Sequence, residues 1–311
     1  MSRLGEAAAA AGYLTGWRVV RALPARLAAR IFQAAADRST RRGGKGVQRL
    51  RSNLRRVVGA EVGEAELDAL VRDGMRSYAR YWLEAFRFPS VPVSRLHATL
   101  DMANPELLDE LHAQGKGVIV ALTHSGNWDH AGAWAAYRGM PVVSVQQRLK
   151  PEVLYDRFVA YRASIGIDIL PLTGGDRSTM DVLAERLAGG QVVCLLADRD
   201  LSASSVEVDF FGGVARMPPG PARLAVRTGA PLIVAQLWYT PTSTAGHLVG
   251  PIVAPEGLDE RAAVAAMTQR MADAFADSIR AHPADWHMLQ RVWPDESGDP
   301  AESTETSAKA G

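Results

Sequence analysis

The sequence predicts an α/β fold with a central, mostly parallel sheet flanked by helices, preceded by an N-terminal amphipathic helical segment. From about residue 100 onward, short apolar runs alternate with helical patterns, and this alternation is typical of a parallel sheet covered on both faces. The chain has 311 residues and is 47% hydrophobic, which is enough to bury one large core. We expect membrane-attachment helices over 1–60, an α/β body over 61–294 that forms one domain with them, and a disordered tail over 295–311.

The N-terminal segment is basic and amphipathic. Residues 1–60 hold 13 Lys and Arg but only two acids, whereas the whole chain has a net charge of +1. Five apolar side chains recur at helical spacing, with arginines between them: Trp17, Val20, Leu23, Leu27 and Ile31. Such a helix can lie in the headgroup plane of an anionic membrane, although an ordinary helix packed on a core would show the same pattern. The positive charge would also suit nucleic acid as an anionic partner, but we expect the protein to bind no nucleic acid.

No membrane span is expected at this end. The uncharged stretch 7–17 is shorter than the roughly 20 residues that a bilayer span needs. The sequence therefore favours peripheral attachment.

The elements of the body follow from the spacing of apolar residues. A long helix is predicted over 64–88 and a closing helix over 258–281, each with an apolar stripe spaced for burial. Strands are predicted over 117–122, 141–145, 167–171, 191–197, 231–238 and 248–253. Further helices are predicted over 105–114, 128–138, 152–165, 178–189 and 220–228.

The first predicted strand ends in a polar turn that holds His124, and Asp129 follows five residues later. α/β proteins place reacting groups where strands end. His124 could be a general base oriented by the Asp129 carboxylate, or an N-cap histidine with a solvated aspartate in the first helical turn. The first interpretation suits a reaction in which a substrate hydroxyl attacks an activated acyl group. His124 would take the hydroxyl proton and Asp129 would stabilise the imidazolium.

Other polar side chains adjoin strand ends. Arg162 lies near a helix C-terminus, where it could stabilise the helix dipole or hold a phosphate or carboxylate. Asp198, Arg199 and Asp200 directly follow the 191–197 run and could organise sugar hydroxyls or form a solvated turn. We expect these residues to gather with His124 at one edge of the sheet.

Several chemistries lack their motifs. The chain has no G-x-S-x-G, no G-x-x-x-x-G-K-[ST] and no G-x-G-x-x-G after a strand, which disfavours a serine hydrolase elbow, a P-loop and a dinucleotide site. His282, Asp285 and His287 could ligate a metal, but no cysteine or second acid cluster is near them in the sequence, so we expect no metal. The single cysteine permits no internal disulfide and fits a reducing compartment.

Five blocks, in order, carry a family resemblance: 124–129 as a His-x4-acid motif, then 196–200, 206–213, 217–225 and 283–291. Together they resemble the bacterial lipid A late-acyltransferase family, within the glycerolipid acyltransferase superfamily, over roughly residues 10–293. The Ala- and Arg-rich composition and the aspartate at 129 are most similar to actinobacterial members that acylate phosphatidylinositol mannosides. Many relatives carry a hydrophobic N-terminal anchor, and this chain has an amphipathic basic helix instead.

The resemblance implies transfer of a long-chain acyl group, such as palmitoyl, from acyl-CoA to the 6-hydroxyl of a mannose. That mannose is the one on the inositol 2-position of phosphatidylinositol mono- or dimannoside. Acyl-CoA is then a co-substrate with no further cofactor, and the protein is peripheral on the anionic cytoplasmic face of the plasma membrane. By position, His124 and Asp129 correspond to the catalytic pair, and Asp198 to the acid that supports the histidine or the acceptor. The substrate-binding candidates are Arg162, Arg199, Asp200 and Arg216.

Three alternatives stay open. The chain could acylate another acidic glycolipid, or use the same histidine and acid to hydrolyse acyl-CoA with water. It could also be a non-catalytic peripheral lipid-binding protein, which would consume no acyl-CoA with any glycolipid acceptor.

Overall fold

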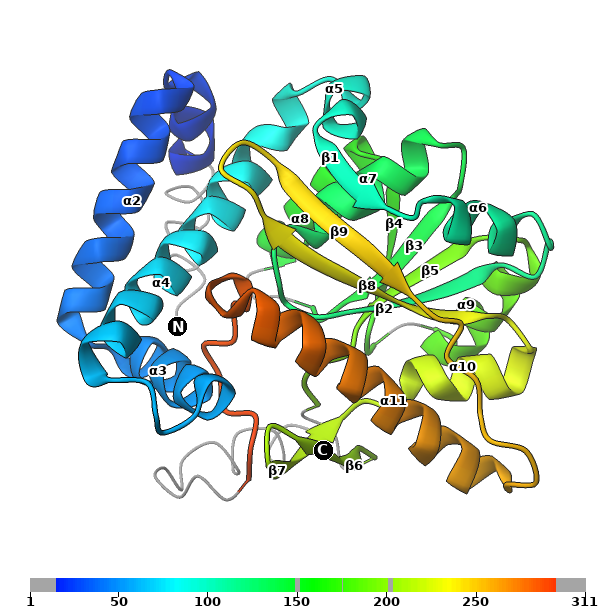
Figure 1. The fold of residues 1–311 in the computed structure, drawn as a ribbon. Helices are drawn as coiled ribbons and strands as arrows, with labels where there is room; N and C mark the ends of the chain where they lie inside the picture. The colour runs from blue at the N-terminus through cyan, green and yellow to red at the C-terminus, as the bar shows by residue number, and fades with distance from the viewer. Residues whose placement is uncertain (1–14, 149–151, 175, 201–203, 295–311) are drawn as a thin grey trace.

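A seven-stranded sheet forms the centre of the computed structural model, which describes residues 15–148, 152–174, 176–200 and 204–294 (Figure 1). Its strands are β1 (Leu100–Ala103), β2 (Val118–Leu122), β3 (Val142–Gln146), β4 (Ile167–Pro171), β5 (Val192–Leu196), β8 (Leu232–Tyr239) and β9 (Thr244–Val249). They lie in the order β1-β9-β8-β2-β5-β3-β4. Only the β8–β9 pair is antiparallel, so the predicted mostly parallel α/β sheet is confirmed. The predicted tail over 295–311 lies outside the described residues.

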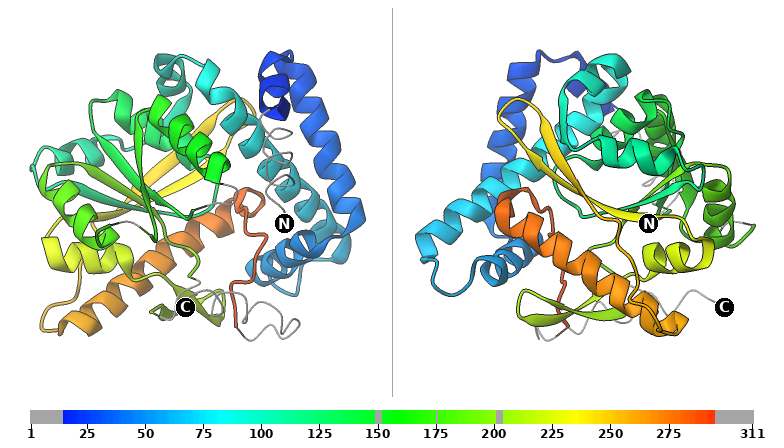
Figure 2. Two further views of the ribbon diagram at one scale, coloured as in Figure 1. Left: turned by 180° about the vertical axis from the view of Figure 1, so that it is seen from behind. Right: turned by 45° about the vertical axis from the view of Figure 1, so that its right-hand side comes forward.

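Helices cover both faces of the sheet (Figure 2). The helices of the body are α4 (Glu64–Arg87), α5 (Val93–Ala98), α6 (Glu106–His112), α7 (Trp128–Tyr137), α8 (Glu152–Ser164), α9 (Thr179–Ala188), α10 (Gly220–Thr228) and α11 (Glu260–Ala281). All but α5 were predicted from apolar spacing. Two short 3-10 helices are added, η1 (Phe88–Ser90) and η2 (Pro283–Asp285).

The two faces are separated by the alternation of side chains along β2, whose five residues are all buried. Ile119 and Ala121 join the core under α9, α10 and α11, whereas Val118, Val120 and Leu122 join the core under α5 to α8. Successive side chains of a strand point to opposite faces. A strand buried on both faces therefore appears in the sequence as a continuous apolar run.

Two N-terminal helices, α2 (Ala25–Arg42) and α3 (Lys45–Val58), pack against α4 at one side of the sheet (Figure 1). A small apolar core joins the three helices and includes Leu50, Leu54, Leu67, Val71 and Met75. Attachment of these helices to a membrane stays a prediction. No helix among the described residues combines the length and the apolar character that crossing a bilayer requires.

The predicted amphipathic stripe is divided between the protein core and the surface. The Trp17 side chain is buried, donates from Nε1 to the Phe86 carbonyl at 2.8 Å and packs on the Phe158 ring. Leu27 and Ile31, beyond the break before α2, are 46% and 48% exposed. The stripe is therefore partly a core-facing helix and partly an exposed apolar surface.

Some strands differ from the prediction. β9 spans Thr244–Val249 rather than 248–253, because Pro251 has no N–H for a ladder and residues 244–247 are too polar to read as a strand. β1 was not predicted, and neither was the hairpin of β6 (Val206–Phe210) and β7 (Gly213–Met217). The hairpin forms a separate two-stranded sheet that contacts α11.

Candidate active site

The register of two neighbouring strands brings His124 and Asp198 together. β2 and β5 are parallel, with Leu122 opposite Leu196. His124 and Asp198 each stand two residues beyond those partners, at the carboxyl edge of the sheet. The chain passes through β3 and β4 between the two strands, so this adjacency exists only in the folded sheet.

The Asp198 carboxylate holds the His124 imidazole. His124 Nδ1 lies 2.7 Å from Asp198 Oδ1, and Oδ2 accepts from the His124 backbone N–H at 2.8 Å and from Trp286 Nε1 at 2.9 Å. Burial alone would raise the pKa of Asp198, but the charge of His124 and these hydrogen bonds outweigh burial and lower the pKa below its ordinary value of 3.8. Asp198 is therefore ionised at neutral pH.

An ionised carboxylate can only accept hydrogen bonds, so in the neutral imidazole of His124 the proton lies on Nδ1 and Nε2 presents a lone pair. Among the described residues, Nε2 has no hydrogen-bond partner. The His124 side chain is 33% exposed, whereas that of Asp198 is fully buried. The arrangement gives a solvent-accessible base whose tautomer is fixed by the Asp198 carboxylate at Nδ1.

The C-terminal segment fixes the turn that carries His124. The His287 backbone N–H donates to the His124 carbonyl at 2.7 Å, and the Gly126 N–H donates to the Asp285 carbonyl at 3.0 Å. Gly126 has φ +55°, and a Cβ there would stand 3.0 Å from the Trp238 backbone nitrogen. The turn therefore requires glycine both for its left-handed backbone and for its approach to β8.

Asp129 does not bond to the histidine, which corrects the expected pairing. Its Oδ1 accepts from Arg162 Nε at 2.7 Å, and its side chain is 2% exposed. The carboxylate that bonds to the His124 ring is that of Asp198. Asp129 occupies the first turn of α7, and there its oxygens meet α8 and α4 instead of the sheet edge.

Two buried tyrosines complete the surroundings of Asp129. The Tyr81 and Tyr161 hydroxyls each donate to Asp129 Oδ2 at 3.2 Å. The Tyr81 ring stacks on Trp128 with centroids 4.1 Å apart, and the Trp128 ring meets the His124 ring edge-on at 5.5 Å. Asp129 thus supports the aromatic wall beside His124.

Arg162 binds Asp129 rather than standing open to an anion. Its Nη1 also donates to the Gln146 side chain, and its side chain is 14% exposed. Burial alone would lower the pKa of Arg162, but the Asp129 carboxylate raises it well above the ordinary value. In the structure the guanidinium ties α8 to α7, and substrate contact by Arg162 stays a prediction.

The other substrate-binding candidates lie on neighbouring segments. Arg199 and Asp200 directly follow Asp198, and the Asp200 backbone N–H donates to the Arg216 carbonyl at 3.3 Å. The Arg216 side chain is half-exposed and reaches Glu207 at 3.5 Å. The structure thus brings the loop after β5 next to the β6–β7 hairpin, and substrate contact by these residues stays a prediction.

His287 was considered in the sequence only as a metal ligand. In the structure its Nε2 lies 2.9 Å from Ser77 Oγ, which in turn donates to Asp285 Oδ1 at 2.6 Å. Within the described ranges, no group of three or more His, Cys, Asp or Glu residues is placed to hold a metal. The sequence carried no signal of this network, because Ser77 lies 210 residues from His287.

The sequence profile of the bacterial lipid A biosynthesis acyltransferase family matches residues 5–294. The chain belongs to this family. It is therefore an acyltransferase, and the match spans every element of the described fold.

Two curated relatives share about half of the acyltransferase's residues. The phosphatidylinositol mannoside acyltransferase of Mycolicibacterium smegmatis is 48% identical over 282 residues, which cover 91% of this chain and 90% of the relative. The phosphatidylinositol mannoside acyltransferase of Mycobacterium tuberculosis strain H37Rv is 46% identical over 283 residues, covering 90% and 87%. The similarity therefore extends over nearly the full length of both relatives.

We expect removal of Asp129 to destabilise the acyltransferase. Asp129→Ala leaves the Arg162 guanidinium buried without its counter-charge, which costs about 3–5 kcal/mol in free energy of unfolding. Arg162→Met in the same chain removes that stranded charge, so the double variant should be less destabilised than the sum of the two single variants. Urea denaturation of all four proteins measures this coupling, and strict additivity would contradict the described contact.

His287 should make the acyltransferase less stable in mild acid. Burial lowers the pKa of His287 from 6.5 to about 3, so above pH 6.5 neither the folded nor the unfolded chain binds this proton. As the pH falls from 6.5 toward 3, the unfolded chain takes up the proton first, and the free energy of unfolding drops by about 1.4 kcal/mol per pH unit for this group. Unfolding free energies measured at pH 7 and 5.5 should show the drop.

The matched variant is His287→Phe, which keeps a buried ring but removes the titrating group. His130 and His282 also have lowered pKa values through burial, and both are present in the two proteins. The difference in slope therefore isolates His287. Equal pH dependence in wild type and variant would refute its contribution.

Proposed function

We propose that the acyltransferase moves a long-chain acyl group from acyl-CoA to a mannose hydroxyl of a phosphatidylinositol mannoside. The observation that carries the chemistry is the buried, ionised Asp198 carboxylate, which leaves Nε2 of the partly exposed His124 imidazole ready to accept a proton. The two relatives named for this activity support the substrate class. Palmitoyl as the acyl group, and the 6-hydroxyl of the mannose on the inositol 2-position of a mono- or dimannoside as acceptor, rest on the family resemblance.

In this mechanism Nε2 of His124 takes the proton of the mannose hydroxyl as its oxygen attacks the thioester carbonyl. The tetrahedral intermediate collapses by breaking the carbon–sulfur bond, and the imidazolium returns the proton to the departing CoA thiolate. The products are the ester and free CoA. Asp198 stays ionised throughout and stabilises the imidazolium while it exists. The protein supplies no nucleophile because the acceptor brings its own.

We further propose that the exposed part of α2 lies on an anionic membrane, where a glycolipid acceptor would reside. Leu27 and Ile31 are one helical turn apart, so their side chains share a face, and both are about half exposed. Arg26 and Arg30 are exposed beside them and would pair with lipid phosphates. Leu27→Asp/Ile31→Asp should weaken cosedimentation with phosphatidylglycerol vesicles, and unchanged cosedimentation would contradict this orientation.

The proposed activity is tested with labelled palmitoyl-CoA and a panel of acidic glycolipids, followed by mass analysis of the products. We expect a monoacylated phosphatidylinositol mannoside and one equivalent of free CoA. Fragmentation of the product locates the ester on the mannose. Phosphatidylinositol without mannose is the matched acceptor control and should not be acylated.

Other outcomes distinguish the alternatives. Release of free fatty acid at a rate that no acceptor changes would indicate hydrolysis by water. Acylation of another acidic glycolipid in preference would change the substrate class and keep the chemistry. No consumption of acyl-CoA with any acceptor would refute the proposal in favour of lipid binding alone.

A further inference from the structure

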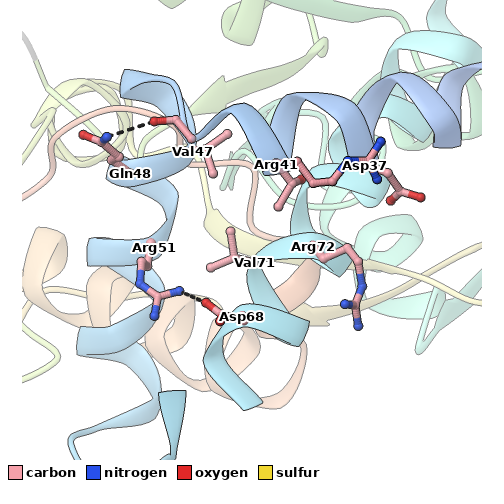
Figure 3. A pocket seen from close by; sticks show the side chains of 10 residues that line it. Asp37, Arg41, Val47, Gln48, Arg51, Asp68, Val71 and Arg72 are labelled. Atoms are coloured by element: carbon pink, nitrogen blue, oxygen red, sulfur yellow. Dashed lines mark hydrogen bonds and ion pairs between the residues drawn. The ribbon is translucent and has the colours of Figure 1, made fainter. Parts of the chain in front are cut away.

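A cavity of about 530 Å³ opens between α2, α3 and α4, on the N-terminal helices (Figure 3). Small-molecule sites have volumes of roughly 300–1,000 Å³. Five charged side chains line the cavity: Asp37 and Arg41 from α2, Arg51 from α3, and Asp68 and Arg72 from α4. A ligand could use only those charges that have no partner within the protein.

Both carboxylates are already neutralised by arginines. Asp37 accepts from Arg76 Nε at 2.7 Å and from Arg76 Nη2 at 2.9 Å, in a two-pronged ion pair. Asp68 accepts from Arg51, as the dashed line in Figure 3 marks. The negative charge at this cavity is thus matched by Arg76 and Arg51.

Two further arginines are left over. Among the described residues, neither Arg41 nor Arg72 has a carboxylate within ion-pair distance, and both side chains are exposed. Their charges act on Asp37, whose pKa is lowered first by the hydrogen bond from Arg76 and then, more weakly, by Arg41 and Arg72. Both guanidinium charges thus lie near Asp37, whose carboxylate is already bound by Arg76, and a second anion in the cavity would be attracted by the two remaining positive charges.

The same cavity has an apolar wall. Val47 and Val71 line it from α3 and α4 and are 8% and 2% exposed, so both side chains are held in place by packing. A ligand that joins an anionic group to a carbon skeleton would use the arginines and this wall together. Guanidinium groups match phosphate oxygens in geometry and charge.

We propose that this cavity binds an organic phosphate ester, with Arg41 and Arg72 on the phosphate and Val47 and Val71 against the carbon skeleton. The ester could be the headgroup of a membrane lipid or a soluble metabolite, and the chemistry of recognition is the same for both. The site does not depend on the acyl-transfer proposal.

This site is separate from the His124 site. Arg72 precedes Tyr81 by nine residues on α4, and Tyr81 stacks on Trp128 beside His124. At 1.5 Å per residue, the two positions are about 14 Å apart along the helix. One helix therefore carries residues of both sites.

The test measures binding to the full-length protein with two probes. Glycerol 3-phosphate is titrated by calorimetry, and phosphatidylcholine vesicles with or without phosphatidic acid are followed by cosedimentation. The variant Arg41→Gln/Arg72→Gln removes both unpaired guanidinium groups. The control Arg38→Gln/Arg42→Gln removes two exposed charges of α2 that do not line the cavity, so the change in net charge is equal.

We expect the cavity variant to bind at least about tenfold more weakly, because two charge-assisted contacts are lost, whereas the control should change affinity by less than about threefold. If the cavity variant, but not the control, binds glycerol 3-phosphate more weakly, the ligand is a soluble ester. If the cavity variant loses affinity only for phosphatidic acid vesicles, the ligand is a lipid headgroup. Equal losses in the two double variants, or no binding of either probe by wild type, would overturn the site. Since all four side chains are exposed, thermal melting should show both variants folded.

Discussion

Replacing His124 with alanine is expected to lower the rate of acyl transfer by about 10³- to 10⁴-fold, the upper part of the range for loss of a general base. The substitution removes Nε2 of the imidazole, the proposed acceptor of the mannose hydroxyl proton. It keeps the backbone N–H and carbonyl that bond to Asp198 and His287. Steady-state release of CoA, with product analysis by mass, measures the loss.

The control for this variant is His112→Ala, which removes a partly buried histidine in the last turn of α6. It should keep wild-type activity. The His124 side chain is one-third exposed, so its removal should change the melting temperature little. Near wild-type turnover by a folded His124→Ala protein would refute the general-base role.

Asp198→Asn is expected to lower kcat by about 10²- to 10⁴-fold while leaving the KM for acyl-CoA nearly unchanged. The asparagine amide is neutral, so it neither stabilises the imidazolium nor enforces the proton on Nδ1 of His124. Because the Asp198 side chain is fully buried and bonds to the imidazole, we expect it to act through the histidine as a positioning residue without touching substrate. The split between kcat and KM distinguishes this role from substrate binding.

A second variant perturbs the Asp198 carboxylate more mildly. Trp286→Phe removes one of the donors to Asp198 and keeps the contact between Asp198 and the imidazole, so kcat should fall about tenfold or less. A raised KM with unchanged kcat in Asp198→Asn would contradict the positioning role. A larger loss in Trp286→Phe than in Asp198→Asn would assign the indole a function of its own.

The sequence located His124, the histidine of the candidate site, but the residues alone paired it with Asp129, whereas its ring bonds to Asp198. His124 was recognisable because an apolar strand ends in a polar turn, a signal contained in a dozen consecutive residues. Asp129 was favoured since it lies five residues away, yet its carboxylate is occupied by Arg162 and two tyrosines. The family resemblance, which compares whole folds, named Asp198 as an acid that supports the histidine or the acceptor.

Local patterns also fixed most elements of the body and missed specific ones. Strands buried on both faces, such as β2 and β5, stand out as apolar runs. β1 and the β6–β7 hairpin have an alternating burial pattern in only four or five residues, which is too short to distinguish from a loop. The apolar stripe of residues 17–31 predicted one continuous face of a helix. In the structure, packing on α4 and α8 buries the first part of this stripe and leaves Leu27 and Ile31 exposed.

The sequence by itself determined the α/β class, the family, the basic N-terminal helices and the histidine at a strand end, because each depends on neighbours along the chain or on motifs in a fixed order. The tertiary structure decided that Asp198 bonds to His124, that Arg162 binds Asp129, and that Arg41 and Arg72 share a cavity. These three facts depend on which strands and helices become neighbours and in what register. The pairing and register of these elements minimise the free energy of the whole core, so they cannot be predicted from any short segment of the sequence.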